Sequence, residues 1–246
     1  MAVLHLLGTG AAASDARRTT TMLAVENAGG VVLIDCGGDV IQRALASGID
    51  PDAIEALIVT HEHADHAGGF ALFMVRIWLL GRKRPIPVFG IEPALRQARR
   101  VLEAFNTSGW DLPEIQWRPV EHRAGAEVLR DERWTITAAP GVHSVPTIGV
   151  RVETAEGGTL AYSCDTEPTP AIVEMSRGVD LLVHEATGVF GGHTSNEGAA
   201  AVAREAGARR LILVHLPPDV HDEQLAEARG IFPHIQFGED GGRHEF

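Results

Sequence analysis

The segment at residues 61–66, His-Glu-His-Ala-Asp-His, constrains this chain more than any other stretch. It follows an apolar run that predicts a strand, and it precedes two glycines where a loop and a helix start are expected. In extended backbone, His61 and His63 project to the same side and can hold one metal ion. Asp65 and His66 come after the chain turns and can face a second ion. This set of nitrogen and oxygen ligands suits zinc, and also manganese or iron.

Three further ligand-type residues stand just past apolar runs. They are His143, Asp165 and His215, and each follows a segment that predicts a buried strand. Taken alone, each is more often a structural residue with satisfied hydrogen bonds than a metal ligand. Taken together with the first segment, they give the order His-x-His-x-Asp-His, His, Asp, His, which supplies enough ligands for two ions.

This ligand order resembles that of the metallo-β-lactamase superfamily, and further segments are similar to its ribonuclease Z branch. The matching segments are Leu7-Gly8-Thr9-Gly10, Leu33-Ile34-Asp35-Cys36-Gly37, Tyr162-Ser163-Cys164-Asp165-Thr166, His184-Glu185-Ala186-Thr187 and His193-Thr194-Ser195. The last two segments are the most specific part of the resemblance, because the broad superfamily lacks them. The similarity extends over nearly the whole chain.

The resemblance implies a role for each of nine side chains. One metal ion is held by His61, His63 and His143, the other by Asp65, His66 and His215, and Asp165 bridges the two. Asp65 is also expected to orient or deprotonate the bridging water. His193 resembles the general acid of the family, and Glu185 the residue that positions it. The implied cofactors are two divalent ions, zinc first, with manganese or iron as alternatives.

Two assignments have structural alternatives, and a third residue is assigned a structural role only. Asp35 either fixes a ligand imidazole from behind or is a carboxylate of a strand-end turn. His193 is either the acid or a helix-capping, exposed histidine. His184 is interpreted as strand-end structure.

The order of elements predicts a four-layer αββα sandwich formed by a single domain, residues 1–246. Strands are expected at 3–7, 20–26, 31–34, 55–60, 87–89, 115–120, 127–129, 134–138, 148–153, 159–163, 181–184, 211–214 and 235–237. Helices are expected at 39–47, 68–80, 93–105, 168–176, 195–206 and 222–230. The helix at 68–80 has almost no polar face, so a homodimer contact or a pocket wall is predicted there.

Composition limits the partners. A net charge of −12 argues against broad electrostatic capture of nucleic acid, so no DNA partner is expected. Cys36 and Cys164 are the only cysteines, and we interpret both as reduced, partly buried thiols of a cytoplasmic protein. The start of the chain lacks the pattern of a signal peptide, and the longest apolar stretch is too short to span a membrane.

Two departures from the ribonuclease Z pattern bear on the substrate. The glycine-rich, basic arm with which those enzymes grip tRNA has no counterpart here, and residues 216–221 lack the family's arginine and carry Asp219 instead. A smaller departure is Cys164, which stands where the family has glycine. We therefore predict a phosphodiesterase that acts through a metal-bridging hydroxide on small, cyclic or single-stranded phosphodiesters. The alternatives are hydrolysis of an aryl sulfate or another ester, true tRNA 3′ processing and, last, a non-catalytic metal-binding protein.

Overall fold

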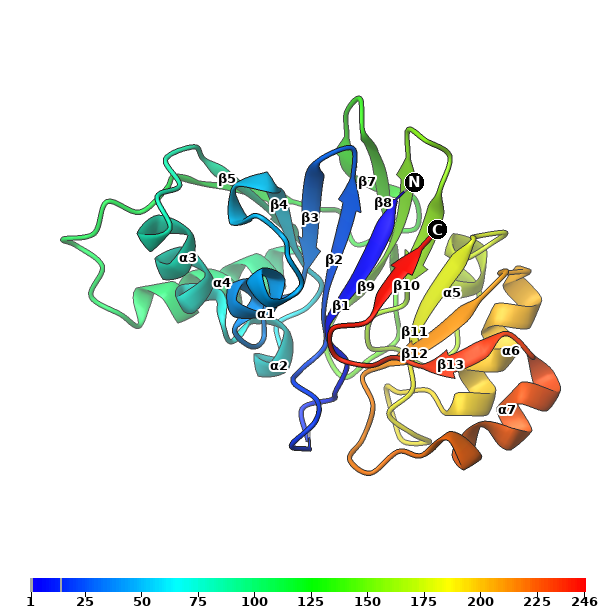
Figure 1. Ribbon diagram of the computed structural model, residues 1–246. Coiled ribbons are helices and arrows are strands. Elements are labelled where there is room, and N and C mark those ends of the chain that lie inside the picture. The colour runs from blue at the N-terminus through cyan, green and yellow to red at the C-terminus, as the bar shows by residue number, and fades with distance from the viewer. Residues whose placement is uncertain (1, 14) are drawn as a thin grey trace.

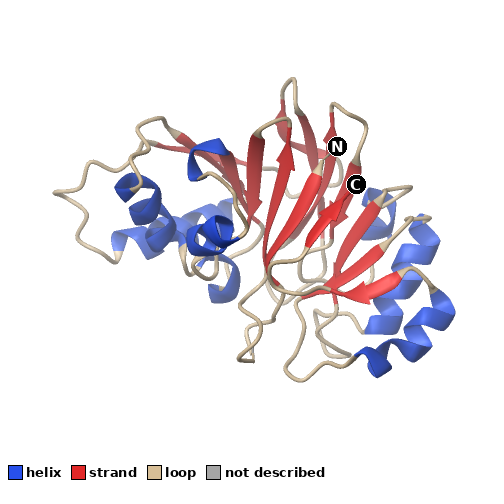
Figure 2. Ribbon diagram, in the orientation of Figure 1, coloured by secondary structure: helices blue, strands red, loops and turns tan. Residues whose placement is uncertain are grey.

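The computed structural model describes residues 2–13 and 15–246, which form two mixed seven-stranded sheets packed face to face, with helices on their outer faces (Figures 1 and 2). One large core of buried aliphatic and aromatic side chains from both sheets fills the space between them. A second core lies beneath the helices that cover the second sheet. The predicted αββα sandwich is confirmed.

The first sheet has the order β14-β1-β2-β3-β4-β5-β6. Its strands are β1 (Val3–Gly8), β2 (Met22–Asn27), β3 (Gly30–Ile34), β4 (Ile54–Val59), β5 (Ile86–Gly90), β6 (Ile115–Pro119) and β14 (Arg243–Glu245). Its helices are α1 (Val40–Ala46), α2 (Ala64–Ala67), α3 (Phe70–Leu79) and α4 (Glu92–Glu103). Strands β3, β4, β5 and β6 run parallel, so their carboxyl ends lie at one edge.

The second sheet has the order β13-β12-β11-β10-β9-β8-β7. Its strands are β7 (Ala126–Arg130), β8 (Trp134–Pro140), β9 (Ile148–Thr154), β10 (Thr159–Tyr162), β11 (Leu181–Glu185), β12 (Leu211–Val214) and β13 (Ile235–Phe237). Its helices are α5 (Pro170–Met175), α6 (Asn196–Ala206) and α7 (Ala226–Ile231). Strands β10 to β13 are parallel, and the polar residues that follow them therefore gather at one edge.

Three local features differ from the sequence prediction. The predicted helix at 68–80 begins at Phe70, and a separate short turn, α2, precedes it within the histidine segment. The predicted helix at 222–230 divides into a 3₁₀ turn (Asp222–Leu225) and α7. Strand β14 was not predicted; it pairs with β1, which brings the C-terminus beside the N-terminal strand (Figure 1).

Candidate metal centre

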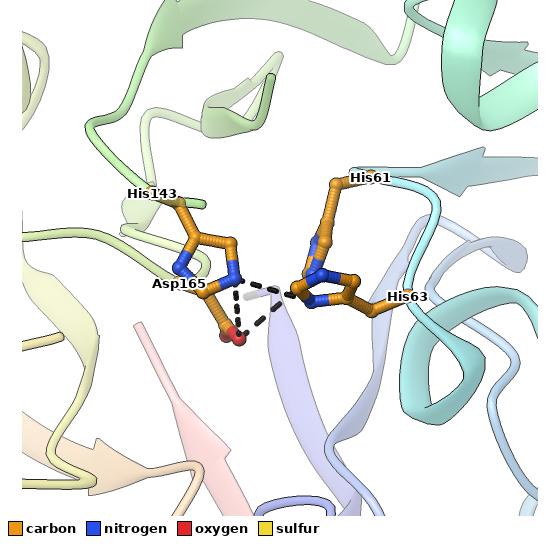
Figure 3. A group of neighbouring side chains, drawn as sticks. All are labelled: His61, His63, His143 and Asp165. Atoms are coloured by element: carbon orange, nitrogen blue, oxygen red, sulfur yellow. Dashed lines mark hydrogen bonds and ion pairs between the residues drawn. The ribbon is translucent and has the colours of Figure 1, made fainter. Parts of the chain in front are cut away.

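The predicted ligands gather where the carboxyl ends of the two sets of parallel strands face each other. His61, His63, His143 and Asp165 form one group, and all of their ligand atoms lie within 4.8 Å of one another (Figure 3). Asp65, His66 and His215 form a second group by the same measure. The structure therefore brings all seven predicted residues together. Overlapping groups also join His61 and His66 to Cys164, and Asp165 and His215 to His193.

Asp165 lies between the two groups. Its Oδ2 is 3.9 Å from His61 Nε2 and 3.8 Å from His143 Nε2, which belong to the first group. The same oxygen is 3.3 Å from His215 Nε2, and Asp165 Oδ1 is 3.5 Å from His66 Nε2 in the second group. One carboxylate thus reaches ligand atoms of both groups.

Several buried ligand atoms have no hydrogen-bond partner in the structure. They are His61 Nε2, His66 Nε2 and Asp165 Oδ1. An unpaired buried polar atom is costly, because it has lost its hydrogen bonds to water and gained none in return. Imidazole nitrogens and a carboxylate oxygen that point at one another are the donor set of a divalent metal site. The residues present therefore fit metal ions.

The segment at residues 61–66 adopts the local structure that separates its ligands. Strand β4 ends at Val59, two residues before His61, and a bend at Glu62 separates His61 from His63. His63 has an extended backbone and starts the turn α2, which carries Asp65 and His66. His63 presents Nδ1 to the group, 3.1 Å from His143 Nε2. Gly37 is necessary for this arrangement, since a Cβ atom there would lie 1.7 Å from the backbone oxygen of Asp65.

Asp35 supports the ligands of the first sheet from behind. This residue follows β3, is 1 % exposed, and accepts a hydrogen bond from His66 Nδ1 at 2.8 Å. It also accepts hydrogen bonds from the backbone nitrogen and hydroxyl of Thr60, and that hydroxyl lies 3.2 Å from His61 Nδ1. Both imidazoles thereby turn Nε2 toward the centre. These contacts favour the supporting role for Asp35 over that of a simple turn residue.

Glu185 supports the second sheet in a parallel way. It ends β11, is fully buried, and accepts a hydrogen bond from Thr187 Oγ1 at 2.8 Å. Thr187 Oγ1 in turn lies 2.6 Å from His215 Nδ1. If that nitrogen donates to the hydroxyl, His215 keeps its Nε2 lone pair for the metal centre. The other carboxylate oxygen of Glu185 accepts from the backbone nitrogen of Thr194 at 2.6 Å.

His193 lies beside the predicted metal ligands but is absent from the predicted ligand set. Its ring stacks on His215 with centroids 5.6 Å apart and meets the His143 ring edge-on at 4.8 Å. Its Nδ1 is 3.5 Å from Glu185 Oε1. The helix cap of α6 is Ser195, whose side chain accepts from Gly198, so His193 does not cap that helix.

The electrostatics of the cluster follow from burial and from charge pairing. Burial lowers the pKa of His61 well below its usual value, which keeps this imidazole neutral and able to bind a metal. Burial acts against the charge on Asp165, but His215 and His66 outweigh it and hold the pKa of that carboxyl well below its usual value. Burial also opposes protonation of His193, yet Glu185 outweighs it and raises the pKa of that imidazole.

Three residues around the site adopt a left-handed backbone that non-glycine residues seldom adopt. They are Asp35 (φ 64°), Cys164 (φ 53°) and His215 (φ 53°), each just after a strand. This geometry explains why glycine suits the position before Asp165. Cys164 is accommodated there with its thiol 2.9 Å from Thr60 Oγ1 and 3.4 Å from His61 Nδ1. Cys36 and Cys164 were predicted to be partly buried; both are free thiols and fully buried.

Thr60, Thr187 and Gly192 also contact the site, but their roles were not predicted from the sequence. The carbonyl of Gly192 accepts a hydrogen bond from His143 Nδ1 at 2.8 Å, which fixes a third imidazole. Thr60 could have been found, because it directly precedes the histidine segment after an apolar run. Thr187 stands in the quoted His-Glu-Ala-Thr segment, but its contact with His215 spans 28 residues and leaves no local signal.

The chain is similar to known proteins over most of its length. The sequence profile described as the beta-lactamase superfamily domain matches residues 31–216. A ribonuclease Z from Methanopyrus kandleri is 30 % identical, with 97 % of this chain and 96 % of that protein aligned. The alignment extends over 283 positions, 37 more than the 246 residues of this chain, so the relative carries segments that have no counterpart here.

Solved structures share the fold over its full length. The short form of human tRNase Z superposes with a TM-score of 0.82 at 23 % identity and covers 100 % of this chain and 99 % of that one. A diphosphatase of the PhnP family superposes with a TM-score of 0.79 at 24 % identity, covering 100 % and 98 %. In the described part of the chain, no helix has the length and apolar character that crossing a membrane requires.

Proposed function

We propose that this chain, which belongs to the beta-lactamase superfamily and to its ribonuclease Z-like branch, is a phosphodiesterase with two metal ions. Its family makes it a metal-dependent hydrolase, as the sequence predicted. The observation that carries the proposal is the position of Asp165, whose oxygens reach ligand atoms of both histidine groups. A carboxylate so placed suits a bridge between two ions.

In this proposal, one ion would be held by His61, His63 and His143, and the other by Asp65, His66 and His215, with Asp165 available to both. Zinc fits these residues best, because imidazoles and carboxylates are ordinary zinc ligands, and manganese or iron would also be accepted. When bound, a pair of divalent ions lowers the pKa of a water between them and stabilises negative charge on phosphoryl oxygens.

The remaining steps fall to the side chains of this chain. Asp65 is ionised, since His215 and His66 outweigh burial and lower the pKa of its carboxyl. It can therefore orient the attacking water or accept its proton. His193 is proposed to protonate the leaving oxygen from Nε2 while Glu185 faces its Nδ1 at 3.5 Å. The raised pKa of His193 keeps a larger fraction of this imidazole protonated near neutral pH.

The proposed substrate is a small, cyclic or single-stranded phosphodiester. Relatives bear the name ribonuclease Z, and a structural neighbour is a diphosphatase, so phosphoester chemistry is common to both. Precursor tRNA is disfavoured, because the relative carries segments that have no counterpart in this chain, whose net charge is −12. The stretch after His215 adds Asp219 and offers no arginine to a phosphate.

The location and assembly are part of the same proposal. We place the protein in the cytoplasm, because its two cysteines are free and buried rather than paired. We also propose a homodimer through the exposed leucines of α3 and the residue that follows it, which are Leu72, Leu79 and Leu80.

The proposal is tested by metal analysis joined to a turnover screen. Protein purified without chelators should contain close to two metal ions per chain. It should hydrolyse bis(4-nitrophenyl) phosphate and nucleoside phosphodiesters with a higher kcat/KM than 4-nitrophenyl sulfate. A metal content that stays below one after reconstitution with zinc or manganese would contradict the two-ion site. Faster hydrolysis of the sulfate would select the aryl sulfatase alternative, and accurate 3′ cleavage of precursor tRNA at physiological salt would select tRNA processing.

A further inference from the structure

We propose that the loop between β11 and α6 forms an apolar wall on the leaving-group side of the site, where a nucleobase stacks on Phe190. The loop comprises residues 188–192, Gly-Val-Phe-Gly-Gly, and we call it the 188–192 loop. This inference rests on the proposed phosphodiesterase activity and goes further, because it specifies a nucleoside as the alcohol that leaves.

The first observation is the exposure of two apolar side chains. Val189 is 89 % exposed and Phe190 is 56 % exposed, although both are large apolar residues. The whole loop carries no charged side chain. Two adjacent exposed apolar side chains at the edge of a polar site provide an apolar surface that a flat ligand can cover.

The second observation is the attachment of the loop to the site. The Gly192 carbonyl accepts from His143 Nδ1, and the Gly192 nitrogen donates to Glu167 Oε1 at 2.9 Å. At the other end, the Gly188 nitrogen donates to the Thr194 carbonyl at 3.1 Å. A side chain at Gly192 would collide with His143 Nδ1, so the loop packs closely on a proposed metal ligand. The tip of the loop is therefore held at a fixed place relative to the metal centre.

The third observation is the neighbour of Phe190. Its ring lies 4.8 Å from the ring of His193, at an interplanar angle of 56°. The backbone nitrogen of His193 also donates to the backbone carbonyl of Phe190 at 3.0 Å. If His193 protonates the leaving oxygen, then the group attached to that oxygen must extend past His193, and Phe190 is the aromatic surface it meets there.

A nucleobase fits this surface better than other leaving groups do. A base presents a flat π face that stacks on phenylalanine and needs no charged partner, and such stacking tolerates any base. The phosphate charge is met by the metal centre, so the wall needs no cation of its own. Because the loop is apolar and has no hydrogen-bonding side chain, we predict that the site prefers substrates with a nucleobase but does not distinguish one base from another.

The test compares two substrates that differ only in the leaving alcohol. One is a dinucleoside monophosphate, and the other is the methyl ester of the same nucleoside 5′-phosphate, so that both yield the same nucleotide. Wild-type protein should prefer the dinucleotide in kcat/KM. Phe190→Ala should lower that preference by about tenfold, which is the range for loss of one stacked base. Phe190→Trp should keep or increase it.

A matched control is available elsewhere on the surface. Phe105, after α4, is 57 % exposed and belongs to neither metal group, so Phe105→Ala should leave the preference unchanged. A second readout is the fluorescence of a dinucleotide with 2-aminopurine at the leaving position, which stacking quenches. Wild-type protein should quench it and Phe190→Ala should not.

The outcomes separate the two proposals. If wild-type protein hydrolyses neither phosphodiester, the proposed function fails. If it hydrolyses both but Phe190→Ala leaves the preference and the quenching as they were, the stacking inference alone is overturned. The inference is also overturned if Phe190→Ala slows both substrates equally, because the loop would then only maintain the metal ligands.

Discussion

Asp35 in the first half of the molecule and Glu185 in the second are buried carboxylates that support imidazoles from behind, and the two differ in what they hold. Asp35 in the first half contacts His66 directly and reaches His61 through the hydroxyl of Thr60. Glu185 in the second half reaches His215 through the hydroxyl of Thr187 and also faces His193. In both halves a threonine hydroxyl connects a carboxylate to an imidazole.

The difference indicates a division of labour. Asp35 supports two proposed metal ligands, His66 directly and His61 through Thr60, and each belongs to a different group. The contacts of Glu185 join one proposed ligand to the proposed proton donor. We infer that the first half mainly orients metal ligands, whereas the second half couples the metal centre to protonation of the leaving group. Outer-shell partners of this kind fix the ring orientation of metal-binding histidines.

The largest effect is expected at Asp165, because its oxygens reach atoms of both proposed ligand groups. Asp165→Ala should release both metal ions together and reduce hydrolysis to background. Elemental analysis and a chelator titration would show a fall from about two ions toward none. Loss of one ion with full retention of the other would show that Asp165 belongs to a single site.

The next largest effect is expected at His193, the proposed proton donor, which belongs to the second half of the chain. A general acid contributes about 10²–10⁴-fold when the leaving oxygen is a strong base. His193→Ala should therefore cost on the order of 10²-fold or more on a nucleoside phosphodiester but little on bis(4-nitrophenyl) phosphate, whose leaving group departs unaided. Equal loss on both substrates, together with loss of metal, would make His193 a ligand or a structural residue.

The two halves also differ in how far the sequence predicted them. In the first half four ligand-type residues lie within six positions, and their spacing already separates them into two groups. In the second half each ligand stands alone after its own strand. His143, Asp165 and His215 were found through family order rather than local chemistry. The fold class was predictable because apolar runs alternate with helical patterns along most of the chain.

The supporting contacts were not predictable to the same extent. Whether Thr187 meets His215 depends on how β11 and β12 pair, and sequence spacing does not encode that register. The short strand β14 was missed because only three polar residues form it, and its pairing with β1 joins opposite ends of the chain. Long-range pairing decides both features.

A smaller effect is expected when the contacts of Asp35 and of Glu185 are removed separately. Asp35→Asn should lower the affinity for both metal ions by about 10- to 100-fold, because Asp35 supports a proposed ligand in each group. Thr187→Val should lower the affinity for only the ion that His215 is proposed to hold, by about tenfold. Competition with a chromophoric chelator would resolve one or two affected binding steps. Thr159→Val, which alters a threonine at the far end of β10 bonded to Asp180, is the matched control.

The smallest effect is expected at the outer surface of the first half. Leu72 and Leu79 are seven residues apart on α3 and share a face, and they are 42 % and 69 % exposed. Leu80, directly after the helix, is 54 % exposed. Such a patch is expected to pair with its copy about a twofold axis, so Leu79→Glu should shift sedimentation toward the monomer. Leu45→Glu, on α1, is the control. Because the patch is formed by the outer helix rather than by the metal ligands, Leu79→Glu should leave kcat unchanged. A wild-type protein that sediments as a monomer at high micromolar concentration would refute the dimer.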